Sequence, residues 1–334
     1  MITEIPHFRT VLFAALVVQS LHYGWTSRNS NIPTKIINAL VLLYSWTLAL
    51  TFFVSDRQTV LNYISSIFGG GAGLPLPEKD YGDVCAIYVP NHPSGDPFFN
   101  VTDRVDIFVI AHSLGWFVKT LVLRDVKTAW ICSILFEIVE VCFAHLLPNF
   151  NECWWDSIIM DVFGCNMIGI HLADLVLTLL GATKFNFFDR AFASQPSRSK
   201  KIPIDFKAMF AVCLLTILIT MIDLNFFFLK FVLFIPTTHW ISYVRTLLWV
   251  LISIPGAWEM FKWSSAKPSS RHESTACRSC VIGCAGLVTE MIFYILLRGD
   301  SFAHASPTPL YTYLLVVTLV YATVRSGIKA TSRI

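Results

Sequence analysis

The sequence predicts an all-α, polytopic integral membrane protein with about nine transmembrane helices, and ten as the alternative. Of its 334 residues, 55% are hydrophobic and 14% are charged, whereas soluble domains carry about 25% charged residues. A mean hydropathy of +0.61 and long apolar runs point to the same class. This composition excludes a disordered chain, a collagen-like chain and a soluble enzyme. The net charge of +3 gives no reason to expect nucleic-acid binding.

Nine apolar segments are long enough to cross the hydrocarbon core of a bilayer, which needs about 20 helical residues. They cover residues 10–25, 36–54, 107–123, 128–147, 157–181, 206–235, 241–261, 277–297 and 309–324. The sixth segment is too long for one untilted helix, so a break near Asp223–Asn225 is expected. No segment shows the alternating periodicity of strands. We expect residues 1–334 to form a single membrane domain.

The basic residues indicate which side of the membrane each loop faces. If nine crossings alternate, seventeen Lys and Arg residues lie on one side and five on the other. The positive-inside rule assigns the richer side to the cytosol. The C-terminus and the basic loop 182–205 are then cytosolic. The N-terminus and the loops 55–106, 148–156 and 298–308 face the lumen or the exterior.

The only long connection is the segment 55–106. An apolar stretch at 60–68, followed by glycines and prolines, predicts an interfacial helix and then a turn-rich loop. Cys85 and Cys153 would both lie on the lumenal side, where a disulfide between them is one alternative and free thiols are the other. Asn100 begins a glycosylation sequon on the same side.

An unusual run of charge lies between residues 128 and 183. This segment contains no Lys or Arg but six acidic residues: Glu137, Glu140, Glu152, Asp156, Asp161 and Asp174. An ionised carboxylate at bilayer depth costs several kcal/mol unless it faces a partner, a cavity or an ion. Because no cation within the segment can pair with these acids, two explanations remain: protonated carboxyls or a bound metal ion.

The spacing of the acids favours the metal ion. Glu137 and Glu140 are three residues apart and are therefore neighbours on one helical face. Glu152 and Asp156 are four residues apart, whereas Asp161 lies about 140° from Asp156 around an ideal helix and is expected to meet a different helix. An oxygen-rich set without cysteine suits a hard cation such as calcium better than zinc. The alternative is helix–helix hydrogen bonding by isolated acids.

Other polar and aromatic residues accompany the acids. His112 lies inside the span 107–123; alone it would be a packing residue, but near carboxylates it can accept a proton around neutral pH. Asn149 and Asn166 add amide groups to the same region. Trp154 and Trp155 could surround a quaternary ammonium group by cation–π contact. The alternative for the two tryptophans is an interfacial aromatic belt.

Three blocks of sequence resemble the eukaryotic phosphatidylserine synthases that work by base exchange. They are DIFVIAHSLGW (106–116), HLLPNFNECWWD (145–156) and DVFGCNMIGI (161–170). The resemblance implies an enzyme of the endoplasmic reticulum membrane that replaces the choline or ethanolamine of a phospholipid with L-serine, using calcium and no nucleotide. The family's functional positions match eight residues: His112, Glu137, Glu140, Asn149, Glu152, Asp156, Asp161 and Asn166.

The chain also departs from the family pattern. Met167 and Ile168 stand where the family has a small pair, and the basic segment 182–205 is shorter than usual. Because the family's product feedback is associated with that segment, such feedback is in doubt here.

Together the residues and the resemblance give one expected site, within catalytic core helices at 107–181. Calcium would be held by acids of the set Glu137, Glu140, Glu152, Asp156 and Asp161. His112 would move the proton, and Asn149, Asn166, Trp154 and Trp155 would bind or orient the substrates. Phosphatidylcholine or phosphatidylethanolamine and L-serine would be those substrates, and a homo-oligomer is an open alternative.

Two other functional classes remain as alternatives. An ion- or proton-coupled transporter also places acids inside helices, but the internal repeats typical of that class are not found in this sequence. A lipid enzyme with a CDP-activated substrate would carry the pattern D-x2-D-G-x2-A-R-x8-G-x3-D-x3-D, which nothing in the chain fits.

Overall fold

The computed structural model describes six stretches of the chain: residues 31–54, 56–76, 81–105, 107–192, 205–266 and 277–297. Within them the regular elements are helices, and the only strand-like pairing is a parallel bridge between Tyr81 and Glu152. The all-helical class is therefore confirmed for the described part of the chain. Packing divides the chain into unit 1 (Met1–Leu76 and Ile217–Ala303) and unit 2 (Pro77–Thr216 and His304–Ile334). The single membrane domain remains a prediction.

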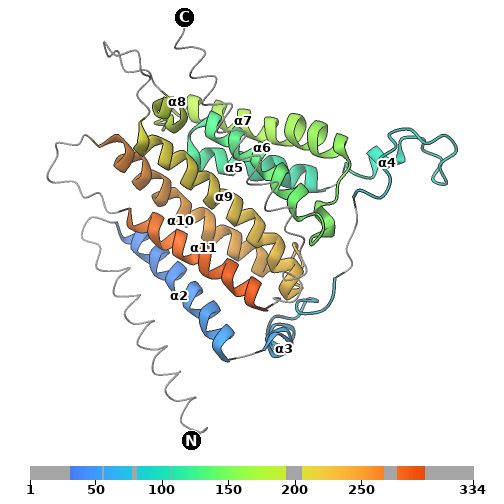
Figure 1. Ribbon diagram of the computed structural model, residues 1–334, viewed down its shortest axis with the longest axis horizontal. Helices are drawn as coiled ribbons and strands as arrows, with labels where there is room; N and C mark the ends of the chain where they lie inside the picture. Colours follow the sequence, from blue (N-terminus) through green and yellow to red (C-terminus); the bar gives the residue numbers. More distant parts are fainter. Residues whose placement is uncertain are drawn as a thin grey trace, which may run out of the picture. The chain divides into compact units, whose positions relative to one another are not determined.

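Long apolar helices make up most of unit 1. They are α2 (Ile32–Val54), α10 (Trp240–Ser265), α11 (Arg278–Leu297) and the second half of α9 (Phe206–Leu233). α2, α10 and α11 pack side by side (Figure 1). A Cβ atom on Gly286 of α11 would lie 2.9 Å from the Trp249 ring. The glycine therefore lets α11 approach its neighbours closely, as small residues do between membrane helices.

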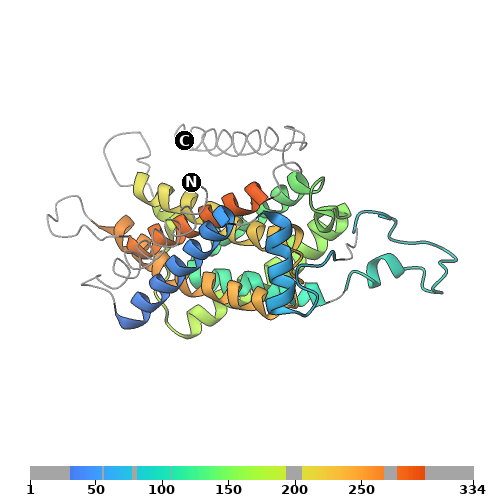
Figure 2. The ribbon, with the colours of Figure 1, turned by 90° about the horizontal axis from the view of Figure 1, so that it is seen from below.

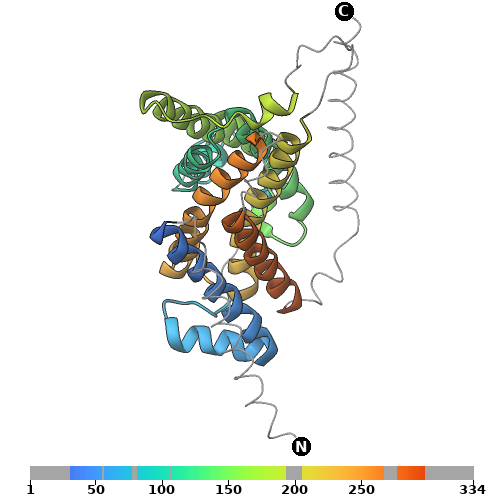
Figure 3. The ribbon, with the colours of Figure 1, turned by 90° about the vertical axis from the view of Figure 1, so that its left-hand side faces the viewer.

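The helix α3 (Arg57–Phe68) follows α2 directly and runs across its end (Figures 2 and 3). It begins where the Asp56 carboxylate accepts a hydrogen bond from the Thr59 backbone N–H at 2.9 Å. It ends at Gly69, whose φ of 61° lies in the left-handed region that favours glycine. The helix expected over 60–68 is thus present and begins three residues earlier. Its place at the membrane interface remains a prediction.

Three helical segments form the body of unit 2. They are α5 (Ile107–Leu123), α6 (Val126–Phe143) and a continuous helix made of η2 (Asp156–Asn166) and α7 (Met167–Leu179). Each of the three packs against the other two. The shorter elements of this unit are α4 (Phe99–Thr102), η1 (Pro148–Phe150) and α8 (Phe187–Phe192). α4 lies on a loop that projects away from the three packed segments (Figure 1).

The start of α6 is held by one buried side chain. The Asp125 carboxylate accepts hydrogen bonds from the backbone N–H groups of Lys127 and Thr128 at 3.1 and 3.3 Å. It also accepts one from the N–H of Phe188 at 2.9 Å. Because these bonds satisfy free donors at the start of α6 and in α8, Asp125 fixes where the helix carrying two of the acids begins.

Five described helices have the length and composition to cross a membrane: α2, η2 with α7, α9, α10 and α11. α5 covers the expected span 107–123 with 17 residues, and α6 (Val126–Phe143) ends before the expected end at residue 147; neither is among these five helices. The segments 10–25 and 309–324 lie outside the described residues, so the count of nine remains a prediction.

The break expected near Asp223–Asn225 is wrong, because α9 continues from Phe206 to Leu233. The buried Asn225 amide donates to the Leu287 backbone oxygen at 3.1 Å and to the Glu290 carboxylate at 3.0 Å. Since tertiary partners accept both hydrogen bonds of the Asn225 amide nitrogen, the helix need not unwind to satisfy this donor.

Candidate active site

The segment Asp156–Asn166 is a π-helix, whose hydrogen bonds join residues five positions apart instead of four. Residues with this spacing therefore return to the same side. Asp156, Asp161 and Asn166 are 7%, 8% and 0% exposed, while Ile158 and Phe163 between them are 49% and 59% exposed. The expectation that Asp161 leaves the face of Asp156 assumed an ideal α-helix and is wrong for this segment.

Three glutamates converge next to this π-helix. One oxygen each of Glu137, Glu140 and Glu152 lies within 4.8 Å of the other two. Glu137 and Glu140 come from one face of α6, as their spacing predicted, and Glu152 comes from the loop before the π-helix. Glu140 is buried, and the other two are half-buried. This carboxylate cluster (Glu137, Glu140 and Glu152) is the group of described residues best placed to hold a metal ion.

Neutral side chains hold two members of the carboxylate cluster in place. The Asn166 Nδ2 group donates to Glu137 Oε1 at 3.2 Å and to Ser133 Oγ at 3.0 Å. The Ser157 hydroxyl donates to Glu152 Oε2 at 3.2 Å. The sequence prediction includes Asn166 but misses both serines. The sequence does contain a signal for Ser133, because this residue lies four positions before Glu137 and therefore on the same helical face.

Two buried oxygens at this site have no hydrogen-bond partner among the described residues. They are Oε2 of Glu137 and Oδ1 of Asn166. Unpaired buried oxygens are costly, and a cation would satisfy them. Carboxylate and amide oxygens are also the ligands that calcium prefers. The residues therefore fit a hard divalent cation on the chemistry of their donor atoms.

The electrostatics of Glu152 point the same way. Burial, followed by the nearby carboxylates of Asp161 and Asp156, raises the pKa of Glu152 to about 8. Like charges this close favour a bound proton or cation over a free anion. Asp156 and Asp161 therefore lie near the carboxylate cluster, although neither is part of the group of three oxygens.

His112 on α5 lies beside Asp161 of the π-helix. Its Nδ1 atom is 4.0 Å from Asp161 Oδ1, and the two side chains are 31% and 11% exposed. The charge of His112 also acts on Glu152, so the imidazole lies close to the carboxylate cluster. The imidazole is therefore near the acids, as expected, and is partly open to its surroundings.

A glycine brings the backbone of α5 close to that of α7. A Cβ atom on Gly169 would lie 2.2 Å from the backbone oxygen of Ser113, the residue after His112. Any larger residue at position 169 would push the two helices apart. This contact therefore fixes the position of His112 relative to the helix that carries Asp161.

A disulfide ties the long loop to the residue next to Glu152. Cys85 and Cys153 are bonded, with their Cα atoms 5.3 Å apart, which confirms the disulfide alternative. The Trp155 indole N–H donates to the backbone oxygen of Cys85 at 3.1 Å, and Tyr81 forms its bridge with Glu152. The loop 81–85 therefore runs along residues 152–155 and restrains Glu152.

The structure separates the two tryptophans. Trp155 is 3% exposed and uses its indole N–H inside the protein, whereas Trp154 is 60% exposed. The pair therefore does not present two open ring faces to a quaternary ammonium group. Asn149 lies half-buried in η1, the turn that precedes Glu152.

Asp174, the last of the six acids in the segment 128–183, has a basic partner. Asp174 forms an ion pair of 2.6 Å with Lys184, a residue just beyond the segment 128–183. The expectation that these acids lack a basic partner is therefore wrong for Asp174, which was not among the expected metal ligands.

Comparisons with known proteins identify relatives of the chain. The family model described as phosphatidyl serine synthase matches residues 34–298. The chain is 34% identical over 244 residues to CDP-diacylglycerol--serine O-phosphatidyltransferase 1 of Arabidopsis thaliana, covering 66% of this chain and 56% of that protein. It is 36% identical over 214 residues to phosphatidylserine synthase 2 of Homo sapiens, covering 59% and 43%. For phosphatidylserine synthase 2 of Mus musculus the identity is 35% over 276 residues, covering 77% and 56%.

The chain thus spans about half the length of these relatives. The family match includes the whole region from His112 to Asn166, where the histidine, the π-helix and the carboxylate cluster lie. A match over residues 34–298 shows that the chain belongs to the phosphatidyl serine synthase family.

Proposed function

We propose that this protein makes phosphatidylserine by base exchange, replacing the choline or ethanolamine of a membrane phospholipid with L-serine. The observation that carries the proposal is the convergence of Glu137, Glu140 and Glu152 within 4.8 Å, near a histidine paired with an aspartate. This combination offers a cation site and a proton acceptor in one place. The family membership and the name phosphatidylserine synthase 2 of the human and mouse relatives support the synthesis of phosphatidylserine.

Calcium would be held by the carboxylate cluster, with Asp156 and Asp161 nearby and the unpaired oxygens of Glu137 and Asn166 available. When bound, it would neutralise negative charge on the phosphodiester of the donor lipid. The hydrogen bonds from Asn166 and Ser157 would keep the carboxylates in position.

His112 would move the proton during exchange. Nδ1 of His112 faces Asp161, so Nε2 is the ring atom that would act on the substrate. The imidazole would accept the proton of the serine hydroxyl as that oxygen attacks phosphorus, and would return the proton to the departing choline or ethanolamine oxygen. Asp161 would stabilise the imidazolium formed between the two transfers. One phosphodiester replaces another, so no nucleotide is needed.

A covalent intermediate is the mechanistic alternative. In that version His112 itself attacks phosphorus, and serine then displaces the phosphatidyl group from the imidazole. Trapping labelled lipid on the protein, with loss of the label in His112→Ala, would support this version over direct displacement.

The names of the plant relatives favour a second candidate function. They describe serine phosphatidyl transfer from CDP-diacylglycerol, in which serine would displace CMP from the activated lipid. The sequence pattern of CDP-dependent enzymes is absent from this chain, and for that reason we prefer base exchange.

Serine incorporation into defined liposomes separates these functions. The purified protein is given labelled L-serine with phosphatidylcholine, phosphatidylethanolamine or CDP-diacylglycerol as the only donor, with calcium or with a chelator. We expect labelled phosphatidylserine from one of the first two donors, with release of choline or ethanolamine, and no product with chelator. Product from CDP-diacylglycerol alone, with release of CMP, would show the second function. Calcium or proton flux without serine incorporation would instead indicate a transporter.

We also propose that the protein resides in the endoplasmic reticulum membrane with the carboxylate cluster toward the lumen. The excess of basic residues on the opposite side supports this orientation. The disulfide between Cys85 and Cys153 agrees with an oxidising compartment for the adjoining loop. Glycan attached at Asn100 in microsomes would support the orientation, whereas modification of Cys85 by a cytosolic thiol reagent would contradict it.

A further inference from the structure

Unit 1 contains a cavity that no part of the proposed reaction uses. Its volume is about 620 Å³, within the range of pockets that bind small molecules. Its walls come from α2, α3, the end of α9, the start of α10 and the end of α11. All of these residues belong to unit 1. Neither His112 nor any member of the carboxylate cluster lines the cavity.

The helix α3 turns one apolar face toward this cavity. The lining residues of this helix follow the spacing of one helical face: Val60, Tyr63, Ile64, Ile67 and Phe68. On another face, Gln58 and Asn62 hydrogen-bond to each other at 3.1 Å. Phe68 also makes an edge-to-face contact with Trp240 at 5.7 Å, which links α3 to the start of α10.

Two threonines of α2 line the inner wall of the cavity, and their hydroxyl groups already make hydrogen bonds within that helix. The Thr47 hydroxyl donates to the backbone oxygen of Leu43 at 2.9 Å, and the Thr51 hydroxyl donates to that of Thr47 at 2.8 Å. These hydroxyls therefore have less to offer a polar ligand.

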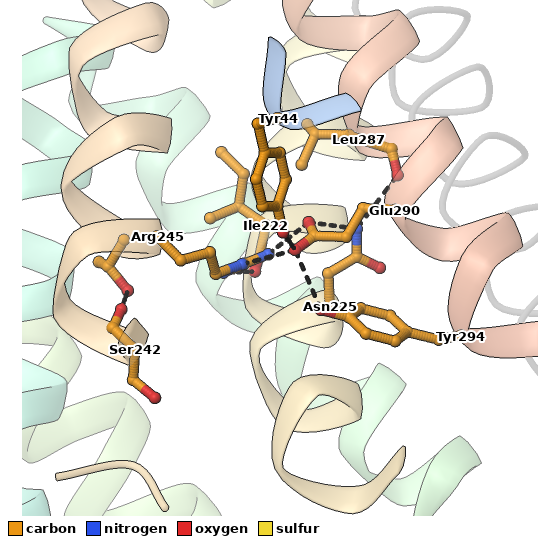
Figure 4. A network of polar contacts seen from close by, with 9 residues as sticks. Tyr44, Ile222, Asn225, Ser242, Arg245, Leu287, Glu290 and Tyr294 are labelled. Carbon is orange, nitrogen blue, oxygen red and sulfur yellow. Dashed lines mark hydrogen bonds and ion pairs between the residues drawn. The ribbon is translucent and has the colours of Figure 1, made fainter. Parts of the chain in front are cut away.

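The guanidinium group of Arg245 on the inner wall is also paired, here with a carboxylate from another helix. Arg245 Nε and one of its terminal nitrogens donate to the two carboxylate oxygens of Glu290, both at 2.8 Å. The hydroxyls of Tyr44 and Tyr294 donate to the same carboxylate at 2.5 and 3.1 Å (Figure 4). The Arg245 and Glu290 side chains are 3% and 0% exposed, so the charge of Arg245, which lines the cavity, is already neutralised.

The mouth of the cavity is apolar as well. Tyr63 and Ile67 of α3 are 58% and 68% exposed, and Trp240 and Val244 of α10 are 53% and 56% exposed. In a membrane protein such a surface is suited to contact with lipid. Aromatic residues such as Tyr63 and Trp240 are enriched at the level of the lipid head groups.

We propose that this cavity binds an acyl chain of a membrane glycerophospholipid, whose head group stays at the bilayer surface near α3. A polar ligand would lose its hydrogen bonds to water and find the polar groups of the inner wall already paired. An acyl chain has no polar group to leave unpaired, and inside the cavity it makes van der Waals contact with the apolar side chains. The site is separate from the proposed exchange reaction and does not depend on it.

Photo-crosslinking tests the proposal. The full-length protein is placed in nanodiscs that contain a phosphatidylglycerol with a diazirine in one acyl chain, and mass spectrometry locates the labelled peptides. Phosphatidylglycerol is not one of the proposed donors, so the labelling is read independently of the reaction. We expect label on the cavity-facing residues of α3 and of the start of α10, in excess over the rest of the lipid-facing surface.

Substitutions on one helix provide a matched comparison. Val244→Trp should fill part of the cavity and lower its labelling several-fold, because the larger side chain occupies space that the acyl chain would fill. Leu247→Trp, at a residue equally exposed at 56% but outside the cavity lining, should leave the labelling unchanged. Ile67→Trp fills the cavity from α3, in case Val244→Trp does not fold.

Three results would overturn the proposal. The first is native protein that carries no more label in the cavity than around Leu247. The second is unchanged cavity labelling in folded Val244→Trp or Ile67→Trp, with the melting temperature and monodispersity as the test of folding. The third is a cavity without label in the native protein, which would mean that a protein segment or a second copy covers it. The first and third need no variant.

Discussion

The Nδ1 atom of His112 lies 4.0 Å from the Oδ1 atom of Asp161, and both residues lie near three converging glutamates. This relationship joins a proton acceptor on α5 to the π-helix that follows Glu152. It makes a direct prediction for His112.

His112→Gln should reduce serine incorporation by about 10²–10⁴-fold, the usual contribution of a positioned acid–base group. Glutamine keeps a polar side chain of similar size but cannot accept and return a proton. The control is His171→Gln, which changes an exposed histidine of α7 whose ring lies 5.9 Å from Trp130. If folded His112→Gln kept near-normal activity while His171→Gln did the same, neither proposed role of His112 would survive.

Glu140→Gln should weaken calcium binding by at least about tenfold, because calcium affinity depends on the number of charged ligands. The substitution preserves the shape of a buried side chain and removes one negative charge from the carboxylate cluster. The calcium-dependent rise in melting temperature measures the effect without any need for activity. Asp174→Asn is the matched control, because Asp174 comes from the same acidic segment but pairs with Lys184. An equal effect of both substitutions would show that calcium binds elsewhere.

Calcium affinity should also rise with pH. Without a metal ion, burial and the neighbouring Asp161 and Asp156 hold the pKa of Glu152 at about 8, above its ordinary value of 4.5. Between these two values the folded protein keeps a proton that the unfolded chain has lost, so the metal-free protein loses stability as pH rises through this window. Calcium must displace that proton, so its affinity should increase up to about tenfold per pH unit below pH 8 and level off above it.

Calcium titrations at several pH values, read from the melting temperature, would show this slope. Glu152→Gln removes one of the protons that calcium must displace, so it should reduce the slope as well as lower the affinity. A calcium affinity that is constant below pH 8 in the native protein would exclude a protonated Glu152.

Loss of the disulfide should impair the site through Glu152. The double variant Cys85→Ser, Cys153→Ser frees the loop 81–85 from residues 152–155, and removal of a native disulfide typically costs about 2–5 kcal/mol. We expect a lower melting temperature together with weaker calcium binding, because Glu152 loses its restraint. Cys213→Ser changes an exposed free cysteine and should alter neither quantity. A destabilised double variant with unchanged calcium affinity would mean that the disulfide does not position Glu152.

Much of the fold follows from composition and local spacing, and the boundaries of α5, α10 and α11 agree closely with the apolar segments. The pairing of Glu137 with Glu140 is equally local, since both lie on one turn of α6. The face shared by Asp156, Asp161 and Asn166 could not be predicted in this way. It depends on a π-helix, and an apolar pattern read with the α-helical period places Asp161 on the wrong side.

Contacts between residues far apart in the sequence could not be predicted from local patterns either. Arg245 and Glu290 lie within different apolar helices, and they meet only because α10 packs against α11. Asn225 was interpreted as a helix break for the same reason, since its partners lie more than sixty residues away. A search for opposite charges in different apolar segments would have found the first pair.

Gly169→Ala should damage the site without touching any proposed ligand. Its Cβ atom would lie 2.2 Å from the backbone oxygen of Ser113, so α5 and α7 must separate. Overpacking of this kind costs about 1–3 kcal/mol, and the shift moves His112 away from Asp161. Gly115→Ala is the matched control on α5, because its Cβ atom meets nothing within 4 Å and alanine favours a helix. We expect Gly169→Ala to lower the melting temperature and the rate of serine incorporation, and Gly115→Ala to preserve both. Full activity and stability in Gly169→Ala would show that this close contact does not fix the position of His112.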